Sequence, residues 1–156
     1  MLIVDPDVPV AAALARIVEP AASSSRGGMD VTLCSDFFDA RSRLRAAPPA
    51  LLITALRLRE YNGLNLVYLA ASAGLSTRSI VYTEATDTGM AREIRAAGAF
   101  YEVRRRLPVV LPAYLSAVLP PQDRRDIALY DRRHNARPGG RRAVDQPASD
   151  RPASIV

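Results

Sequence analysis

The chain has 156 residues, of which 49% are hydrophobic and 24% charged, a composition typical of one soluble globular domain. Its single cysteine, Cys34, excludes an intramolecular disulfide framework, and its 21 basic residues are all arginine, which excludes Schiff-base chemistry on a lysine. No apolar run approaches the ~20 residues that span a bilayer, and the N-terminus lacks the basic region of a signal peptide, so we expect a cytoplasmic protein without a membrane segment.

Segments of strand type alternate five times with segments of helical periodicity along residues 1–119. Strands are predicted at 1–4, 29–34, 50–56, 78–83 and 99–103. Helices are predicted at 11–19, 35–47, 64–73, 87–98 and 109–119. Pro20 is expected to end the first helix and open a loop through Gly28, and Pro112 is expected in the first turn of the last helix.

This alternation predicts an α/β fold with a parallel sheet and helices on both faces. The segment 50–56 is apolar on both sides, as a central parallel strand requires. Right-handed crossovers leave few topologies, and a flavodoxin-like, doubly wound sheet of five strands is the simplest of them.

Residues 120–156 differ in character from the rest of the chain. They are rich in Pro, Arg, Asp and Gly and carry 8 Arg against 5 acidic residues, compared with 13 against 11 in residues 1–119. So few apolar residues cannot offset the entropy of ordering the segment. We therefore predict one domain over 1–119 and a disordered tail over 120–156, whose arginines at 131–142 are a candidate for binding nucleic-acid phosphates.

Four motifs lie in order on the predicted elements: "LIVDPD" (2–7), "LRLREYNGLNLVYL" (56–69), "IVYT" (80–83) and "REIRAAGAFYEV" (92–103). Together they resemble the receiver (CheY-like) domain of bacterial response regulators over residues 1–119. The resemblance implies a sheet with the strand order 2-1-3-4-5. It also implies a phosphorylation pocket at the carboxyl ends of the strands.

The resemblance assigns a place to each group of that pocket. Asp5 matches the first of two acids that hold Mg²⁺, but the place of the second is Pro6, followed by Asp7. Ala55 stands where the phosphate-accepting aspartate is implied, and Thr83 matches the hydroxyl. The lysine's place falls on Arg105, or on Arg104 if the register of the fifth strand shifts by one. Alanine has no nucleophile, so the resemblance implies a degenerate receiver with Mg²⁺ binding lost or weak.

Other residues of the pocket region have two interpretations each. Thr83 either senses an anion or makes only local hydrogen bonds. Glu60 either replaces a lost carboxylate or is simply solvated. Tyr101 and Glu102 lie near the place of the family's switch aromatic, and the register assigns that place to Glu102.

The favoured hypothesis is a non-enzymatic, stand-alone signalling module that needs no cofactor and acts through a protein partner or a second copy. The resemblance implies a partner face on the fourth helix, fifth strand and fifth helix. Its predicted residues are Met90, Ile94, Tyr101, Glu102, Val109, Val110 and Tyr114. Two alternatives stay open: a regulator phosphorylated at a non-standard site, and a nucleic-acid-associated protein that binds through its arginine-rich tail.

Overall fold

A computed structural model gives the fold and describes residues 1–24 and 30–116. The predicted domain boundary at 119/120 and the whole predicted tail lie outside these residues. No helix in the described ranges combines the length and the apolar character needed to cross a membrane.

Five parallel strands form the central sheet in the order β2-β1-β3-β6-β7. They are β1 (Leu2–Val4), β2 (Thr32–Cys34), β3 (Leu51–Ala55), β6 (Arg78–Thr83) and β7 (Phe100–Val103). This is the predicted order 2-1-3-4-5, with two short strands outside the sheet counted in the numbering. All five residues of β3 are buried, as its continuous apolar sequence predicted for a central strand.

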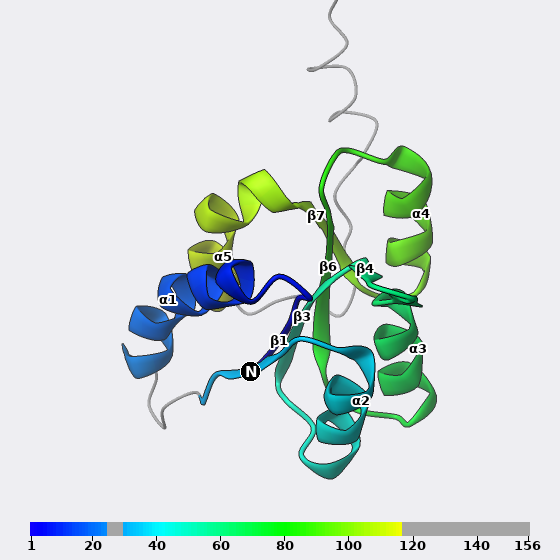
Figure 1. Ribbon diagram of the computed structural model, residues 1–156, viewed down its shortest axis with the longest axis horizontal. Helices are drawn as coiled ribbons and strands as arrows, with labels where there is room; N and C mark the ends of the chain where they lie inside the picture. The colour runs from blue at the N-terminus through cyan, green and yellow to red at the C-terminus, as the bar shows by residue number, and fades with distance from the viewer. Residues whose placement is uncertain (25–29, 117–156) are drawn as a thin grey trace, which may run out of the picture. The chain divides into compact units, whose positions relative to one another are not determined.

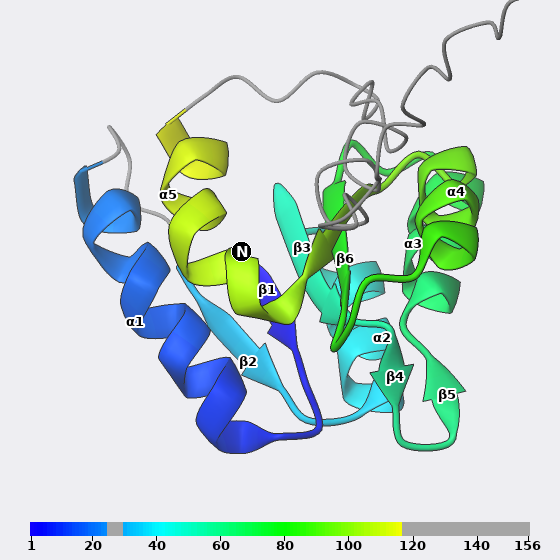
Figure 2. The ribbon, with the colours of Figure 1, turned by 90° about the horizontal axis from the view of Figure 1, so that it is seen from above.

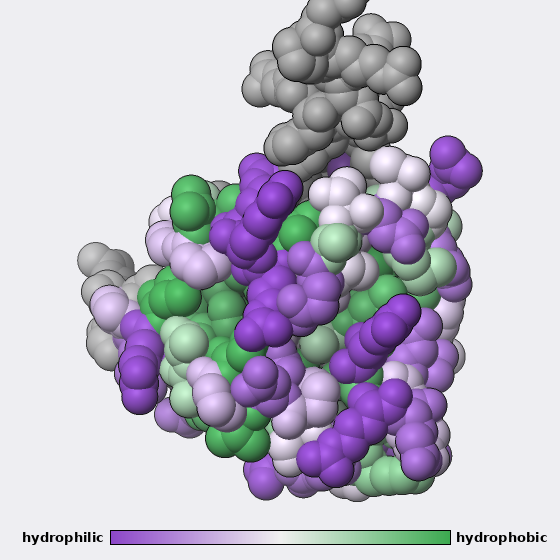
Figure 3. All heavy atoms as spheres, turned by 45° about the horizontal axis from the view of Figure 1, so that its top comes forward, coloured by the Kyte–Doolittle hydropathy of each residue, from purple (hydrophilic) through white to green (hydrophobic). Residues whose placement is uncertain are grey.

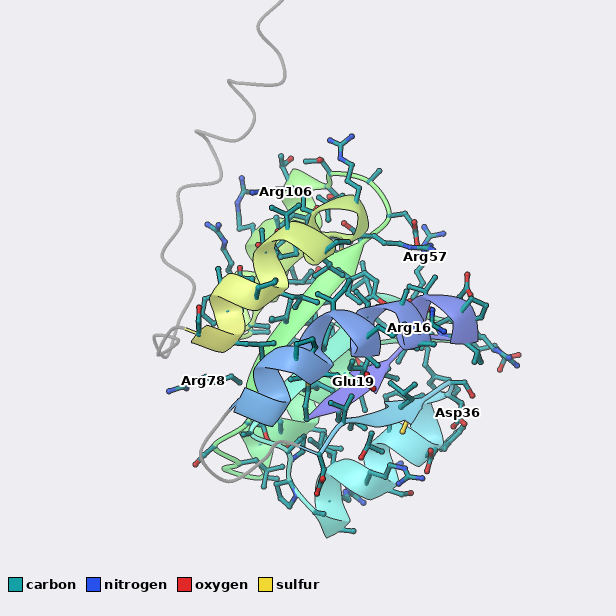
Figure 4. The ribbon with its side chains drawn as sticks, turned by 90° about the vertical axis from the view of Figure 1, so that its left-hand side faces the viewer. Arg16, Glu19, Asp36, Arg57, Arg78 and Arg106 are labelled. Atoms are coloured by element: carbon teal, nitrogen blue, oxygen red, sulfur yellow. The ribbon has the colours of Figure 1, made fainter. Side chains whose placement is uncertain are left out.

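Helices cover both faces of the sheet (Figure 1). α1 (Val8–Ser24) and α5 (Leu107–Ser116) lie on one face, and they run side by side there in Figure 4. On the other face lie α2 (Phe37–Ala46), α3 (Leu64–Ser72) and α4 (Thr88–Ala96). The carboxylates of Asp36 and Asp87 cap α2 and α4 by accepting the backbone N–H groups of Asp39 and Met90.

Both proline predictions were wrong. Pro20 lies inside α1, which begins at Val8 and ends only at Ser24. Pro112 lies inside α5, beyond its first turn, because that helix begins at Leu107. A proline inside a helix removes one backbone hydrogen bond, and the packing of α1 against α5 stabilises both helices despite that loss.

The segment between β3 and α3 forms an antiparallel ribbon that the sequence did not predict. Its strands are β4 (Arg57–Leu58) and β5 (Tyr61–Asn62), joined by a two-residue turn. Arg59 in that turn has a φ of 57°, in the left-handed region that favours glycine. Figure 2 shows the ribbon projecting beside α2 at the carboxyl edge of the sheet. A one-turn 3-10 helix, η1 (Arg104–Arg106), joins β7 to α5.

Gly63 closes the ribbon against the end of β3. Its N–H donates to the Leu56 carbonyl at 2.7 Å. A Cβ atom at this position would lie 2.1 Å from the Ala55 carbonyl oxygen and 2.6 Å from Thr54 Oγ1. The backbone therefore requires glycine here for lack of space, since its φ of −59° is open to any residue.

Replacing Gly63 with alanine should lower the free energy of unfolding by about 3 kcal/mol, because β3 and the ribbon must move apart to admit the methyl group. Urea denaturation followed by circular dichroism measures this loss. Gly89→Ala in α4 is the matched control, since its nearest neighbour is only a side-chain oxygen, Asp87 Oδ1, at 3.3 Å. Equal stability of the two variants would contradict the packing described here.

Candidate functional site

A pocket of about 550 Å³ opens where β1, β3 and β6 end at the carboxyl edge of the sheet. Parallel strands bring the residues that follow them to one edge, so distant parts of the sequence meet there. The structure brings Asp5, Pro6, Asp7, Ala55 and Thr83 together in this pocket, as predicted from the resemblance. Arg105 is exposed in η1 and is not among the lining residues, whereas Arg104 is.

The register of β7 explains the change from Arg105 to Arg104. Thr83, the last residue of β6, pairs with Val103, the last residue of β7. The next residue, Arg104, therefore stands at the strand end beside the pocket. The predicted place at Arg105 was one residue too far along the chain, and the alternative register was the correct one.

Asp5 is the acid at the centre of the pocket, and both of its carboxylate oxygens accept hydrogen bonds from the protein. The residue is 4% exposed. The backbone N–H of Asp7 donates to Oδ1 at 2.7 Å, and the Tyr82 hydroxyl donates to Oδ2. A buried carboxylate needs such partners to offset its lost hydration. Asp5 is thus hydrogen-bonded within the fold through both of its oxygens.

Tyr82 is a site residue that the sequence analysis missed. It pairs with Ala55 across β3 and β6, so its ring stands beside the place implied for the phosphate acceptor. Its burial raises the pKa of its hydroxyl far above the ordinary value, and the hydrogen bond to Asp5 and the charge of Asp5 add to the increase. A tyrosine inside the aliphatic strand "IVYT" was the available signal, because a buried hydroxyl requires a partner.

Arg104 pairs with two other acids of the rim. Its Nη1 donates to Glu84 Oε1 at 2.7 Å, and its Nη2 lies 3.9 Å from Asp7 Oδ2. The hydrogen bond that Arg104 donates to Glu84 is the main cause of the raised pKa of its guanidinium. The side chains are 37%, 73% and 51% exposed in the order Arg104, Glu84 and Asp7, so solvent screens these pairs and they add little stability. They link the end of β7 to the segments that follow β6 and β1.

Thr83 makes local hydrogen bonds, which supports the simpler of its two interpretations. Its hydroxyl donates to the Ala85 carbonyl at 2.7 Å. Its oxygen lies 2.9 Å from the Tyr101 hydroxyl, which donates to it because the Thr83 proton is already used. The Tyr101 oxygen in turn accepts the backbone N–H of Asp87 at 2.9 Å. This network ties β6, β7 and the start of α4 together.

The assignment of Glu102 to the switch position was wrong. Alternation along β7 places Tyr101 and Glu102 on opposite faces of the sheet. Tyr101 reaches Thr83, whereas Glu102 is buried on the α5 side and accepts the Tyr114 hydroxyl at 2.7 Å. The cause is a one-residue error in the predicted register of the fifth strand, which also led to Arg105 in place of Arg104.

Two further polar residues of this region, Glu60 and Thr54, do not line the pocket. Glu60 is exposed on the β4–β5 turn and does not line the pocket. Thr54 is buried, and its hydroxyl donates to the Ala55 carbonyl. Within residues 1–24 and 30–116, no three side chains of His, Cys, Asp or Glu gather as a metal site would require.

Comparisons with known proteins identify the fold. No family model matches the chain, and no curated protein is significantly similar in sequence. Among solved structures, the chain is similar to the chemotaxis protein CheY4 from Vibrio cholerae, with a TM-score of 0.64 and 21% identity over 76% of this chain and 96% of that one.

Two further structures show the same likeness. The signal receiver domain of a DNA-binding response regulator from Colwellia psychrerythraea has a TM-score of 0.63 and 19% identity, over 74% of this chain and 97% of that one. A CheY-like receiver domain protein from Methanospirillum hungatei has a TM-score of 0.59 and 19% identity, over 74% and 91%. The chain has the receiver-domain fold.

Replacing Tyr82 with phenylalanine should lower the free energy of unfolding by about 1–3 kcal/mol, because buried Asp5 Oδ2 loses its donor. Urea denaturation measures the change. Tyr68→Phe is the control, since Tyr68 is 46% exposed on α3 and makes no hydrogen bond within the described residues. An unchanged unfolding midpoint in the Tyr82 variant would show that this hydrogen bond does not stabilise Asp5.

Proposed function

We propose that this chain, which has the receiver-domain fold, is a non-enzymatic signalling module that acts in the cytoplasm by phosphorylation-independent contact with a protein partner. The observation that carries the proposal is the state of the pocket. Ala55 stands in the acceptor's place, and the acid that remains from the strand-one pair, Asp5, has both oxygens hydrogen-bonded by Tyr82 and Asp7. The pocket has no carboxylate at the place implied for the acceptor, and it has Pro6 at the place implied for the second acid.

Loss of Mg²⁺ binding is part of the proposal. Mg²⁺ seeks several oxygen ligands in near-octahedral geometry. Asp5 is held by the Tyr82 hydroxyl and the Asp7 N–H, and as a single buried carboxylate it would supply only one or two of those ligands. Asp7 and Glu84 would have to exchange Arg104 for the ion. This exchange costs free energy, because Asp7 and Glu84 would each lose their ion pair with Arg104.

The exposed part of the α4–β7–α5 face is the proposed partner surface. Val109 is 79% exposed on α5, Val110 and Tyr114 of the same helix are half-buried, and Met90 is half-buried on α4. In Figure 3 apolar atoms gather on the left, the side that α1 and α5 occupy in Figure 1, while hydrophilic side chains form a band across the centre. An exposed apolar group of this kind suits a protein partner.

Three residues predicted on this face are not available to a partner. Ile94 is fully buried on the inner side of α4, and Tyr101 and Glu102 are buried in β7. The resemblance placed them on the partner face, but whether a side chain is exposed there depends on which side of its element packs against the sheet. The face proposed here therefore consists of Met90, Val109, Val110 and Tyr114.

Ala55→Asp alone should not give efficient phosphorylation, because the added carboxylate lacks a second acid and Asp5 stays bonded to Tyr82. Incubation with acetyl phosphate and Mg²⁺, followed by intact-mass measurement, tests this. The labelled fraction should rise when Pro6→Asp and Tyr82→Val are added to Ala55→Asp, since these changes supply the second acid and release Asp5.

The wild-type chain is the reference in this experiment, and circular dichroism checks that every variant is folded. A stable phosphoryl adduct on the wild-type chain would refute the proposal. Efficient labelling of Ala55→Asp alone would show that the pocket retains its metal site.

Val109→Asp should weaken binding to the physiological partner at least about tenfold, as expected for an apolar residue at the centre of an interface. Affinity capture from the native host, followed by titration of the captured partner, measures the loss. Val8→Asp on α1 is the matched control, because Val8 is also a surface valine, 59% exposed. Equal weakening by both variants would place the interface elsewhere.

A further inference from the structure

Three aromatic side chains gather on the surface beside the β4–β5 ribbon. Phe37 of α2 stacks on Tyr61 of β5 with ring centroids 4.8 Å apart and an interplanar angle of 11°. Phe38 meets Tyr61 edge to face at 5.0 Å. Phe38 is nevertheless 55% exposed and Tyr61 38% exposed. The chain has only nine Phe and Tyr residues and no Trp, so a third of its aromatic residues lie in this cluster.

These rings line a groove of about 260 Å³, which we call the aromatic groove, together with Asp36, Arg59 and Glu60. It lies apart from the pocket at the ends of β1, β3 and β6, with which it shares none of these residues. Asp36 stands at the start of α2, at the edge of the molecule where Figure 4 labels it. Glu60 makes no ion pair or hydrogen bond with any described residue.

The aromatic groove carries a negative electrostatic character from two sources. Its charged side chains are Asp36, Glu60 and Arg59, which sum to a formal charge of −1. The faces of aromatic rings add negative potential, since their quadrupoles attract cations. Aromatic rings flanked by carboxylates complement a guanidinium or ammonium group. A purely apolar occupant would instead desolvate Glu60 without a partner and leave Asp36 with only its helix-cap hydrogen bond.

We propose that the aromatic groove binds an arginine or lysine side chain of a protein partner, with the cation over the exposed rings and beside Asp36 and Glu60. The site contributes no residue to the α4–β7–α5 face, so its occupancy does not depend on the function proposed above. Failure of the Val109 experiment and failure of this proposal are therefore distinguishable. Phe38 and Tyr61 supply the rigid aromatic contact, and the two carboxylates supply the selectivity for charge.

The test titrates the full chain with the tripeptide acetyl-Gly-Arg-Gly-amide and follows the aromatic side-chain resonances by NMR. The resonances of Phe38 and Tyr61 should shift in a saturable way, and the shift should weaken as salt is added. Phe38→Ala should weaken binding about two- to fivefold, as expected for a cation over a partly exposed ring. Tyr68→Ala, which removes an aromatic residue that is 46% exposed outside the groove, should leave binding unchanged.

Charge substitutions distinguish cation binding from a purely structural role of the aromatic cluster. Asp36→Asn keeps the cap of α2, because asparagine caps helices as well as aspartate does. Together with Glu60→Gln it should weaken peptide binding without unfolding the chain. Arg59→Gln should strengthen binding, because it removes the cation that opposes the ligand.

Matched peptides define the results that would overturn the proposal. Acetyl-Gly-citrulline-Gly-amide, which is uncharged and has nearly the shape of the arginine peptide, should bind more weakly. Equal binding of that peptide or of acetyl-Gly-Leu-Gly-amide would show an apolar site instead. Self-association of the chain without peptide, measured by sedimentation and abolished by Phe38→Ala, would assign the groove to a second copy. The absence of any saturable shift would refute a cation site.

Discussion

The hydrogen bond between the buried Asp5 carboxylate and the Tyr82 hydroxyl is the interaction on which the rest of the pocket depends. A carboxylate at the end of a central strand is costly to bury unless donors reach both of its oxygens. Tyr82 supplies one donor from β6 and the Asp7 backbone supplies the other. The acid is thereby held in place by two donors from the protein itself.

The register of β7 sets the second half of the site. Since Val103 pairs with Thr83, Tyr101 faces the α4 side and Glu102 faces α5. Tyr101 then bonds Thr83 and the first turn of α4, and Arg104 reaches Glu84 and Asp7. These polar groups at the strand ends thereby find partners from neighbouring elements. Such a closed set of contacts favours one conformation of the loops around the pocket.

The surfaces that we propose for recognition lie outside the pocket. Val109 is exposed on α5, on one face of the sheet, and the aromatic groove lies between α2 and the ribbon on the other. The two differ in chemistry, because one is apolar and the other combines rings with carboxylates. The two surfaces proposed for partners thus lie away from the pocket, on different elements of the fold.

The sequence by itself determined the alternation of strands and helices, the buried central strand and the gathering of Asp5, Ala55 and Thr83 at one edge. The first two follow from hydrophobic periodicity, whereas the gathering at one edge was implied by the resemblance to receiver domains. Only the tertiary structure decided which residue after β7 reaches the pocket, that Tyr82 bonds Asp5, and that Ile94 is core. The physical reason is that side-chain direction depends on strand register to a single residue, and burial depends on which side packs, neither of which periodicity resolves. Pro20 and Pro112 show the same limit, because packing between α1 and α5 outweighed the local preference of proline to end a helix.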